Sequence, residues 1–346
     1  MPSTQQFRKR IRSIKNTSQI TKAMEMIASV KMQKAIRTVA SARSYTQNAW
    51  AMLTTLAEMS SSKNHPLLQK REVKRSLLII AGADRGLCGS YNSDLGRKVV
   101  SYIKNNNSVI SALSSVSPAS SSVIPAEAGI LGNKIPDQVR DDKDKRPEAQ
   151  IDVVAAGKKA AELAKKLGLN LVAEFPSFEL DVEFWESRPV SKFAIESYIK
   201  GDYDKVDMVY SHFVSTLKQT PAIKQLLPID RHHIDLPELW GEIQGEDSLS
   251  LKNRPVEMTN GIDYKFEPNT DEILERILPQ FIRAVVYGLF LESNASEHSA
   301  RMFAMKNATD NARDLIDDLT LTYNSIRQDS ITKELAEIAG AAEAMK

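Results

Sequence analysis

The sequence of 346 residues contains a single cysteine, Cys88, and therefore cannot form a disulfide within the chain. One thiol is typical of proteins that stay in a reducing compartment. The sequence also lacks any run close to the ~18 apolar residues that a membrane-spanning helix needs. An apolar secretory segment is missing from the N-terminus. Together these absences predict a cytosolic chain whose association with a membrane, if any, is peripheral.

Glycine and proline are missing from two long stretches at opposite ends of the chain. Neither occurs between Pro2 and Pro66, and neither occurs between Gly288 and Gly340. Since these residues interrupt helices, the two gaps predict two long helices. A helix of about 70 residues, rising ~1.5 Å per residue, is on the order of 100 Å long. Pro279 is expected to kink the second helix or to move its start.

Apolar residues in both stretches recur at steps of three and four, which predicts a long antiparallel coiled coil. In the first stretch the phase slips between three groups. In the second, polar residues such as Thr309, Asp310 and Ser330 fall where a tight seam needs apolar ones, so we expect a rod that touches further partners on several sides. The groups are Phe7, Ile11 and Ile14, then Ile20, Met24 and Ile27, then Met32, Ile36 and Val39; the seam is Ala312, Ile316, Leu319, Tyr323 and Ile326, resuming at Ile331, Leu335, Ile338 and Ala342.

Charge is balanced overall but divided between the two ends. The chain has 46 Lys and Arg against 44 Asp and Glu. Residues 1–45 hold ten basic side chains and one acidic one, whereas residues 271–346 hold thirteen acidic and eight basic ones. Attraction between the two helices, or a rod moving through an acidic collar, explains this division. The basic helix could also bind nucleic acid, but no stacking aromatics lie among its bases, and we expect no nucleic-acid partner.

The middle of the chain, residues 75–268, alternates strand-like and helix-like segments. Such alternation predicts a mostly parallel sheet flanked by helices, that is, a Rossmann-like α/β domain. Residues 218–230 end the regular part, and residues 229–262 are expected to form an exposed loop. The expected strands are 76–83, 151–157, 170–178 and 205–213, and the expected helices are 92–106, 158–168 and 190–202.

Residues 108–149 fit none of this pattern. They begin with eight serines in fifteen residues and later carry a run of alternating charge. A connection of ~2–6 residues is usual at this point, so the segment is interpreted as a disordered insertion tolerated at the surface. A role as a binding tail is the alternative. The domains are then 1–65, an N-terminal coiled-coil helix, 75–268, the α/β domain with this insertion, and 269–346, a C-terminal coiled-coil helix.

The turn 84–95, DRGLCGSYNSDL, stands where a phosphate-binding loop would stand, between a strand and a helix. Its glycines fit neither dinucleotide-binding nor P-loop spacing, which favours a tight structural turn. The five histidines show no pair at metal-binding spacing on a helix. We therefore expect no metal, no cofactor and no catalysis by this chain.

Four segments of the sequence closely resemble the gamma subunits of F-type ATP synthases. The resemblance is carried by DRGLCGSYNSDL and TPAIKQLLPI in the middle, by RIRSIKNTSQITKAMEMIASVKMQKA near the N-terminus, and by the C-terminal block from LESNASEHSARM to AGAAEAM. The insertion at 108–149 departs from the family's pattern.

The resemblance implies that the chain is the central rotor shaft of a proton-translocating ATP synthase. Its terminal helices would turn inside a hexamer of alpha and beta subunits, while its globular part would contact the epsilon subunit and the membrane-embedded c ring. ADP and phosphate would be joined in the beta subunits, so that this chain transmits torque and is not catalytic. The absence of a presequence favours a bacterial enzyme, on the cytoplasmic face of the inner membrane.

The resemblance also assigns contacts with the beta subunit. Met24 matches a position that faces a beta-subunit loop, although it could equally pack in the seam of the coiled coil, and both can hold. Arg327, Gln328, Thr332 and Glu334 match positions that form polar contacts with beta; a solvated helix face is the alternative. A DNA-binding coiled-coil protein and a small-molecule enzyme built on the sheet are rival interpretations of the whole chain.

Overall fold

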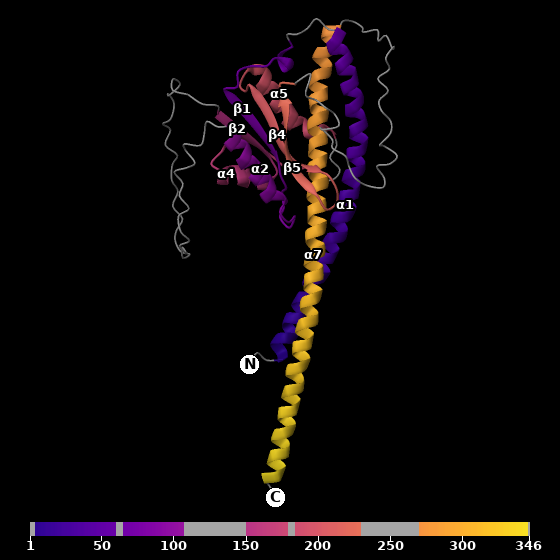
Figure 1. Ribbon diagram of the computed structural model, residues 1–346, viewed down its shortest axis with the longest axis vertical. Coiled ribbons are helices and arrows are strands. Elements are labelled where there is room, and N and C mark those ends of the chain that lie inside the picture. The colour runs from indigo at the N-terminus through magenta and orange to yellow at the C-terminus, as the bar shows by residue number, and fades with distance from the viewer. Residues whose placement is uncertain (1–3, 60–64, 107–149, 179–183, 230–269, 345–346) are drawn as a thin grey trace.

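The computed structural model describes residues 4–59, 65–106, 150–178, 184–229 and 270–344 (Figure 1). The expected insertion at 108–149 lies outside these residues. So does the expected loop at 229–262, except for Ile229.

Two helices dominate the structure, as the gaps in glycine and proline predict. Helix α1 (Thr4–Met59) has 56 residues and helix α7 (Thr270–Ala344) has 75. They run antiparallel, side by side, and form a rod that extends far beyond the rest of the molecule (Figure 1). The predicted long antiparallel coiled coil is confirmed.

Helix α7 continues through Pro279 without a break. A proline inside a helix removes one backbone hydrogen bond and costs ~3 kcal/mol or more. Here the residues around it, Leu278, Phe281 and Ile282, are buried in the core. Burial of these apolar side chains offsets the loss, so the expected shift of the helix start does not occur.

The sheet is mostly parallel, as predicted. Its strand order is β3-β2-β1-β4-β5, and only the pair β4 and β5 is antiparallel. Strand β5, which the sequence did not suggest, contains Pro221 and lies at an edge, where a residue without an N–H is tolerated. The strands are β1 (Arg75–Ala81), β2 (Gln150–Ala156), β3 (Asn170–Phe175), β4 (Lys205–Phe213) and β5 (Gln219–Leu227).

The two faces of the sheet are covered by different layers. Leu78 and Ile80 of β1 pack against helices α2 (Tyr91–Asn105) and α4 (Lys158–Lys166). Their neighbours Leu77 and Ile79 face the opposite way and join a core with helix α5 (Arg188–Lys200) and with residues 270–290 of α7, which we call its upper part. Two short 3-10 helices are η2 (Phe184–Ser187), which precedes α5, and η1 (Pro66–Leu68), which precedes β1. One end of α7 is therefore part of the globular core, whereas its other end belongs to the rod (Figure 1).

Candidate functional site

The seam of the rod follows unbroken heptad spacing. Arg8 donates to the Tyr323 hydroxyl at 3.0 Å, and the hydroxyls of Thr21 and Thr309 lie 2.8 Å apart, which sets the pairing of the two helices. Counting from these pairs, buried and half-buried residues recur at alternating steps of three and four along both helices, so the predicted slip of phase is wrong. They are Phe7, Ile11, Ile14, Ser18, Thr21, Glu25, Ala28, Met32, Ala35 and Val39 in α1, and Met305, Thr309, Ala312, Ile316, Leu319, Tyr323 and Ile326 in α7.

The middle of this seam is polar. Ser18, Thr21 and Glu25 occupy three successive seam positions of α1, and Thr309 opposite them is buried. Thr309 thus confirms the expected polar seam, whereas Asp310 points outward and is exposed. Because small and polar side chains bury little apolar surface, this section is held together more weakly than the apolar layers on either side.

The apolar residues missing from the middle of the seam lie on the outside of the rod. Ile20, Met24 and Ile27 each stand one position before a seam residue, and their exposed fractions are 56%, 37% and 57%. An apolar stripe on the outside of a helix is typical of a surface that contacts another protein. Met24 is therefore outside the seam. Its predicted contact with a beta subunit stays a prediction.

Helix α7 continues beyond the end of α1 as a single helix, whose residues 327–344 we call the tip. Every side chain described from 327 to 341 is exposed. Ile331, Leu335 and Ile338 form an apolar stripe along it with exposed fractions of 49%, 61% and 67%. The expected resumption of the seam here is therefore a stripe with no second helix opposite it in the described parts of the chain.

The four polar residues predicted to contact a beta subunit all lie on the tip. Arg327, Gln328, Thr332 and Glu334 are exposed. The Thr332 hydroxyl donates to the backbone carbonyl of Gln328 at 2.9 Å, within the same helix. The structure thus brings the four together on one free segment, far along the chain and the rod from Met24, and their contact role stays a prediction.

At the opposite end, α7 passes through what we call the junction, residues 291–301. Residues 291–299 are buried, although most are polar. Buried polar groups need hydrogen-bond partners, and the sheet domain supplies several of them. His212 of β4 pairs with the Glu292 carboxylate at 2.8 Å, and the Asn294 amide donates to the Phe178 carbonyl at 2.8 Å.

A second ionic group at the junction faces the turn after β1. Arg301 pairs with Glu297 at 2.6 Å, donates to His298 Nδ1 at 3.2 Å and reaches the Gly86 carbonyl at 3.5 Å. Burial, together with the positive charges of Arg301 and Lys31, lowers the pKa of His298 to about 4. Burial also raises the pKa of Glu297, an effect that Arg301 opposes. The cluster links the turn to the rod.

The turn 84–95 is a structural joint, as the sequence predicts. Gly89, with φ +57°, brings the turn against α7, where a Cβ at Gly89 would lie 3.8 Å from the Cβ of Ala304. The Asp84 carboxylate accepts the backbone N–H of Lys158 at 2.9 Å, at the start of α4. Burial opposes ionisation of Asp84, but hydrogen bonds from Lys158 and Ser177 outweigh it and lower the pKa of Asp84. A carboxylate of the chain itself thus occupies the N-terminus of α4, which is an anion-binding position.

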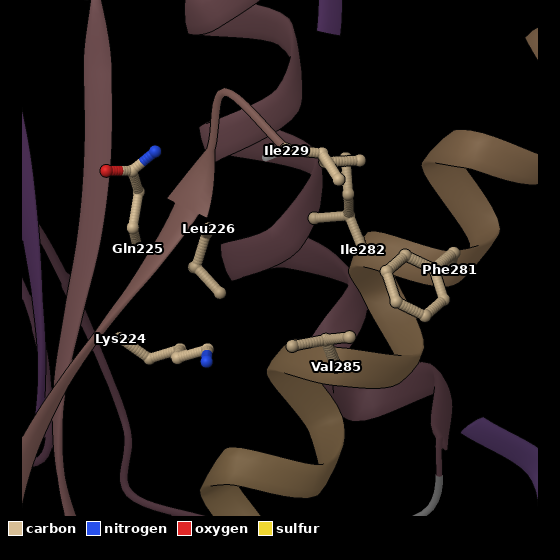
Figure 2. A pocket seen from close by; sticks show the side chains of 7 residues that line it. All are labelled: Lys224, Gln225, Leu226, Ile229, Phe281, Ile282 and Val285. Atoms are coloured by element: carbon tan, nitrogen blue, oxygen red, sulfur yellow. The ribbon is translucent and has the colours of Figure 1, made fainter. Parts of the chain in front are cut away.

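A small cavity lies between β5 and α7. Its volume is about 20 Å³, and it is lined mainly by Leu226 and Ile229 on one side and by Phe281, Ile282 and Val285 on the other (Figure 2). That is room for about one water molecule. Sites for nucleotides and similar ligands are on the order of 300 Å³ or larger, so this cavity is a packing defect and not a ligand site.

Metal binding and membrane insertion find no support in the described ranges. Within 4–59, 65–106, 150–178, 184–229 and 270–344, no group of three or more His, Cys, Asp and Glu side chains is placed to hold a metal ion. Over the same residues, each helix is too short or too polar to cross a lipid bilayer.

Solved structures share this architecture. A chain of the central stalk and c-ring structure of the mitochondrial ATP synthase of Tetrahymena thermophila matches with a TM-score of 0.52 and 21% identity, covering 84% of this chain and 99% of that one. A chain of the mitochondrial ATP synthase of Euglena gracilis, in a structure that includes F1 and the c-ring, matches with a TM-score of 0.54 and 19% identity, covering 99% and 94%. At these identities the likeness concerns the fold.

Similarity in sequence extends over the whole chain. The family model described as ATP synthase matches residues 3–116 and 128–345, and the unmatched residues 117–127 fall inside the segment 108–149. The ATP synthase gamma chain of Heliobacterium modesticaldum is 35% identical, and that of Macrococcus caseolyticus is 36% identical, each over the full length of both chains. With a rod of two long helices, a sheet domain fastened to it and full-length relatives at this identity, the chain belongs to the family of ATP synthase gamma chains.

Proposed function

We propose that the chain is the central rotor shaft of a proton-translocating ATP synthase. In this role the rod turns inside a hexamer of alpha and beta subunits, and the sheet domain, near the other end of α7, contacts the epsilon subunit and the c ring. Rotation driven by proton flow through the ring changes the conformation of each beta subunit in turn. The chain transmits torque between the c ring and the hexamer of alpha and beta subunits, and it catalyses no reaction itself.

One observation carries the proposal: α7 is a single helix with two different environments. Its upper part is a buried element of the globular core, whereas the tip is exposed on every side described. A helix of 75 residues is ~110 Å long. Such a helix mechanically connects a domain with a distant point, and the exposed apolar stripe on the tip is typical of a surface that a partner covers.

The outward-facing side chains of the rod support the proposal that the rod contacts the alpha and beta subunits around it. The apolar stripe at Ile20, Met24 and Ile27 and the apolar stripe on the tip both face outward. We propose that Met24 contacts a loop of the beta subunit, and that Arg327, Gln328, Thr332 and Glu334 form polar contacts with beta further along the rod. Charged groups at such a surface give specificity and steering more than affinity.

The lack of catalysis by this chain is part of the proposal. The acidic groups that could have served a reaction, such as Asp84 in the turn after β1 and Glu292 and Glu297 at the junction, are engaged in hydrogen bonds and ion pairs that hold the fold together. Nucleotide chemistry then belongs to the alpha and beta subunits.

We further propose that the chain is bacterial and lies on the cytoplasmic side of the inner membrane, as a peripheral subunit that reaches the membrane only through the c ring. The curated relatives of high similarity, including those from Heliobacterium and Macrococcus, are bacterial.

The division into 1–65, 75–268 and 269–346 describes chain segments, and we propose that 108–149 is an insertion which rotation tolerates.

Reconstitution with purified alpha and beta subunits tests the rotor role. ATP hydrolysis is measured for alpha and beta alone, with the full chain, and with the chain lacking residues 108–149. We expect one co-eluting complex with high activity in both of the last two mixtures, and rotation of a bead attached to the sheet domain during hydrolysis. A chain that neither joins the complex nor changes turnover, with or without residues 108–149, would contradict the proposal.

A further inference from the structure

The hydroxyl groups of α7 bond in two different ways along the helix. A serine or threonine inside a helix commonly donates to the backbone carbonyl four residues earlier. Every serine and threonine in the rod and tip sections of α7 for which a bond is described follows this rule, and among them only Thr309 also contacts another helix, at Thr21. These bonds run from Thr309 to Met305, from Thr320 to Ile316, from Thr322 to Asp318, from Ser330 to Ile326 and from Thr332 to Gln328.

Three serines of the junction depart from the rule. Ser293, Ser296 and Ser299 stand three residues apart, and each donates across to a backbone carbonyl of the sheet domain. The acceptors belong to the last residue of β1, to β4 and to the loop after β4. The bonds run from Ser293 to Ala81 at 3.2 Å, from Ser296 to Ser211 at 2.9 Å and from Ser299 to Thr216 at 2.6 Å.

Two of these hydroxyls also accept hydrogen bonds from the sheet domain. The Ser211 N–H donates to the Ser293 hydroxyl at 3.4 Å, and the Gln219 amide donates to the Ser299 hydroxyl at 3.2 Å. Ser293, Ser296 and Ser299 have exposed fractions of 3%, 0% and 0%. Because these hydroxyls are buried, their hydrogen bonds lie in surroundings of low dielectric constant, where a hydrogen bond is electrostatically stronger than in water.

We propose that Ser293, Ser296 and Ser299 are positioning residues that prevent α7 from turning about its own axis against the sheet domain. Apolar packing is non-directional and permits small rotations, whereas hydrogen bonds weaken steeply when their angle changes. Three bonds spread over six residues span ~9 Å of the helix axis. They resist both rotation and tilt at the point where torque passes from the sheet domain into the shaft. This inference rests on the proposed rotor function.

The test compares two double variants of matched burial in the full complex. Ser296→Ala/Ser299→Ala removes three bonds across the junction, those to the carbonyls of Ser211 and Thr216 and the one from the Gln219 amide. Ser187→Ala/Ser191→Ala also removes three bonds, of serines that are equally buried, at 0% exposed, but whose hydroxyls donate to carbonyls of their own segment, at Phe184, Ser187 and Arg188. Equal losses of thermal stability are expected for the two.

The readout is the angular spread of a bead attached to the sheet domain while the hexamer is held still. A thiol introduced by Lys166→Cys, on the exposed side of α4, is labelled selectively because Cys88 is buried. We expect the spread to increase about twofold or more in Ser296→Ala/Ser299→Ala and to stay unchanged in the control variant. ATP hydrolysis is expected to stay within about twofold of the unmodified chain, while proton pumping per ATP falls.

An equal spread in the two double variants would overturn the inference, even if both lose stability. A broader spread in the control variant would overturn it as well, because general loosening would then explain the effect. Failure of the rotor function is distinguishable: the unmodified chain would then show no rotation and no assembly with alpha and beta subunits. Ser296→Thr, which retains the hydroxyl, is expected to restore part of the stiffness that Ser296→Ala removes.

Discussion

The upper part and the tip of α7 are two regions of one unbroken helix with opposite surroundings. Leu289 and Phe290 in the upper part are almost completely buried, whereas Leu335 on the tip is 61% exposed. Both regions carry apolar side chains at helical spacing, so helix formation and apolar pattern alone do not distinguish them. The difference teaches that one half of the pattern serves the fold of this chain and the other half serves a surface outside it.

The largest expected effect is a loss of stability, and it tests the comparison between the upper part and the tip directly. Leu289→Ala leaves a cavity in the core and should lower the free energy of unfolding by ~2–5 kcal/mol. Leu335→Ala, the same substitution on the tip, should change it by less than ~0.5 kcal/mol. Urea unfolding followed by circular dichroism measures both. Comparable losses would mean that the tip packs against something within the isolated chain.

A pH dependence should separate the junction from the tip. His298 has a pKa of about 4 in the folded chain against 6.5 in the unfolded one. The unfolded state therefore binds the proton first, so stability is complete above pH 6.5 and falls as the pH drops towards 4, by at most ~1.4 kcal/mol per pH unit from this group.

The variant His298→Gln should lose this component, so that its stability depends less steeply on pH between 6.5 and 4 than that of the unmodified chain. Glu334→Gln on the tip serves as the control and should keep the original slope over this range. Parallel curves for His298→Gln and the unmodified chain would show that the imidazole titrates freely at the junction.

A smaller effect is expected in the polar middle of the seam, between the two regions. Thr21→Val and Thr309→Val each remove one hydroxyl of the pair 2.8 Å apart, and the double variant removes both. Because a single deletion leaves the other hydroxyl short of a partner, we expect a coupling energy of ~0.5–1.5 kcal/mol. Unfolding of the four proteins gives this value. Additive losses would mean that the hydroxyls act independently.

The smallest change in stability is expected on the tip, together with a change in function. Arg327→Glu should alter the free energy of unfolding by less than ~0.5 kcal/mol because the side chain is exposed. If Arg327 contacts a beta subunit, proton pumping per ATP should fall in the assembled complex, and Arg327→Lys should lose less. Failure of Arg327→Glu to fold or assemble would instead give this residue a structural role.

The large elements could be predicted from the sequence, because helices and strands follow from local patterns. The absence of glycine and proline from two stretches predicted both long helices, and the alternation of strand-like and helix-like segments in the middle predicted the parallel sheet. Strand β5 was not predicted, because Pro221 argues against a strand unless the strand is known to lie at an edge. Edge position depends on the order of strands in space, which a single sequence does not reveal.

Details of the site were harder to predict for a related reason. The groups around Ile20, Met24 and Ile27 suggested a slipping seam, because apolar residues were assumed to face the partner helix. The continuous seam runs instead through Ser18 and Thr21, and only the structure shows which side is outside. The sequence carries one signal of the junction, the serines at 293, 296 and 299, which form a polar series where a core helix would be apolar.

The distance in sequence between the partners of the rod has a consequence for synthesis. Helix α1 is made first, but its seam partners in α7, from Met305 to Ile326, are made last, after the whole sheet domain. At ~5–20 residues per second, α1 waits on the order of ten seconds to a minute for its partner. During this time the seam residues of α1 are uncovered, so the nascent chain should depend on a chaperone or on the ribosome surface until translation ends.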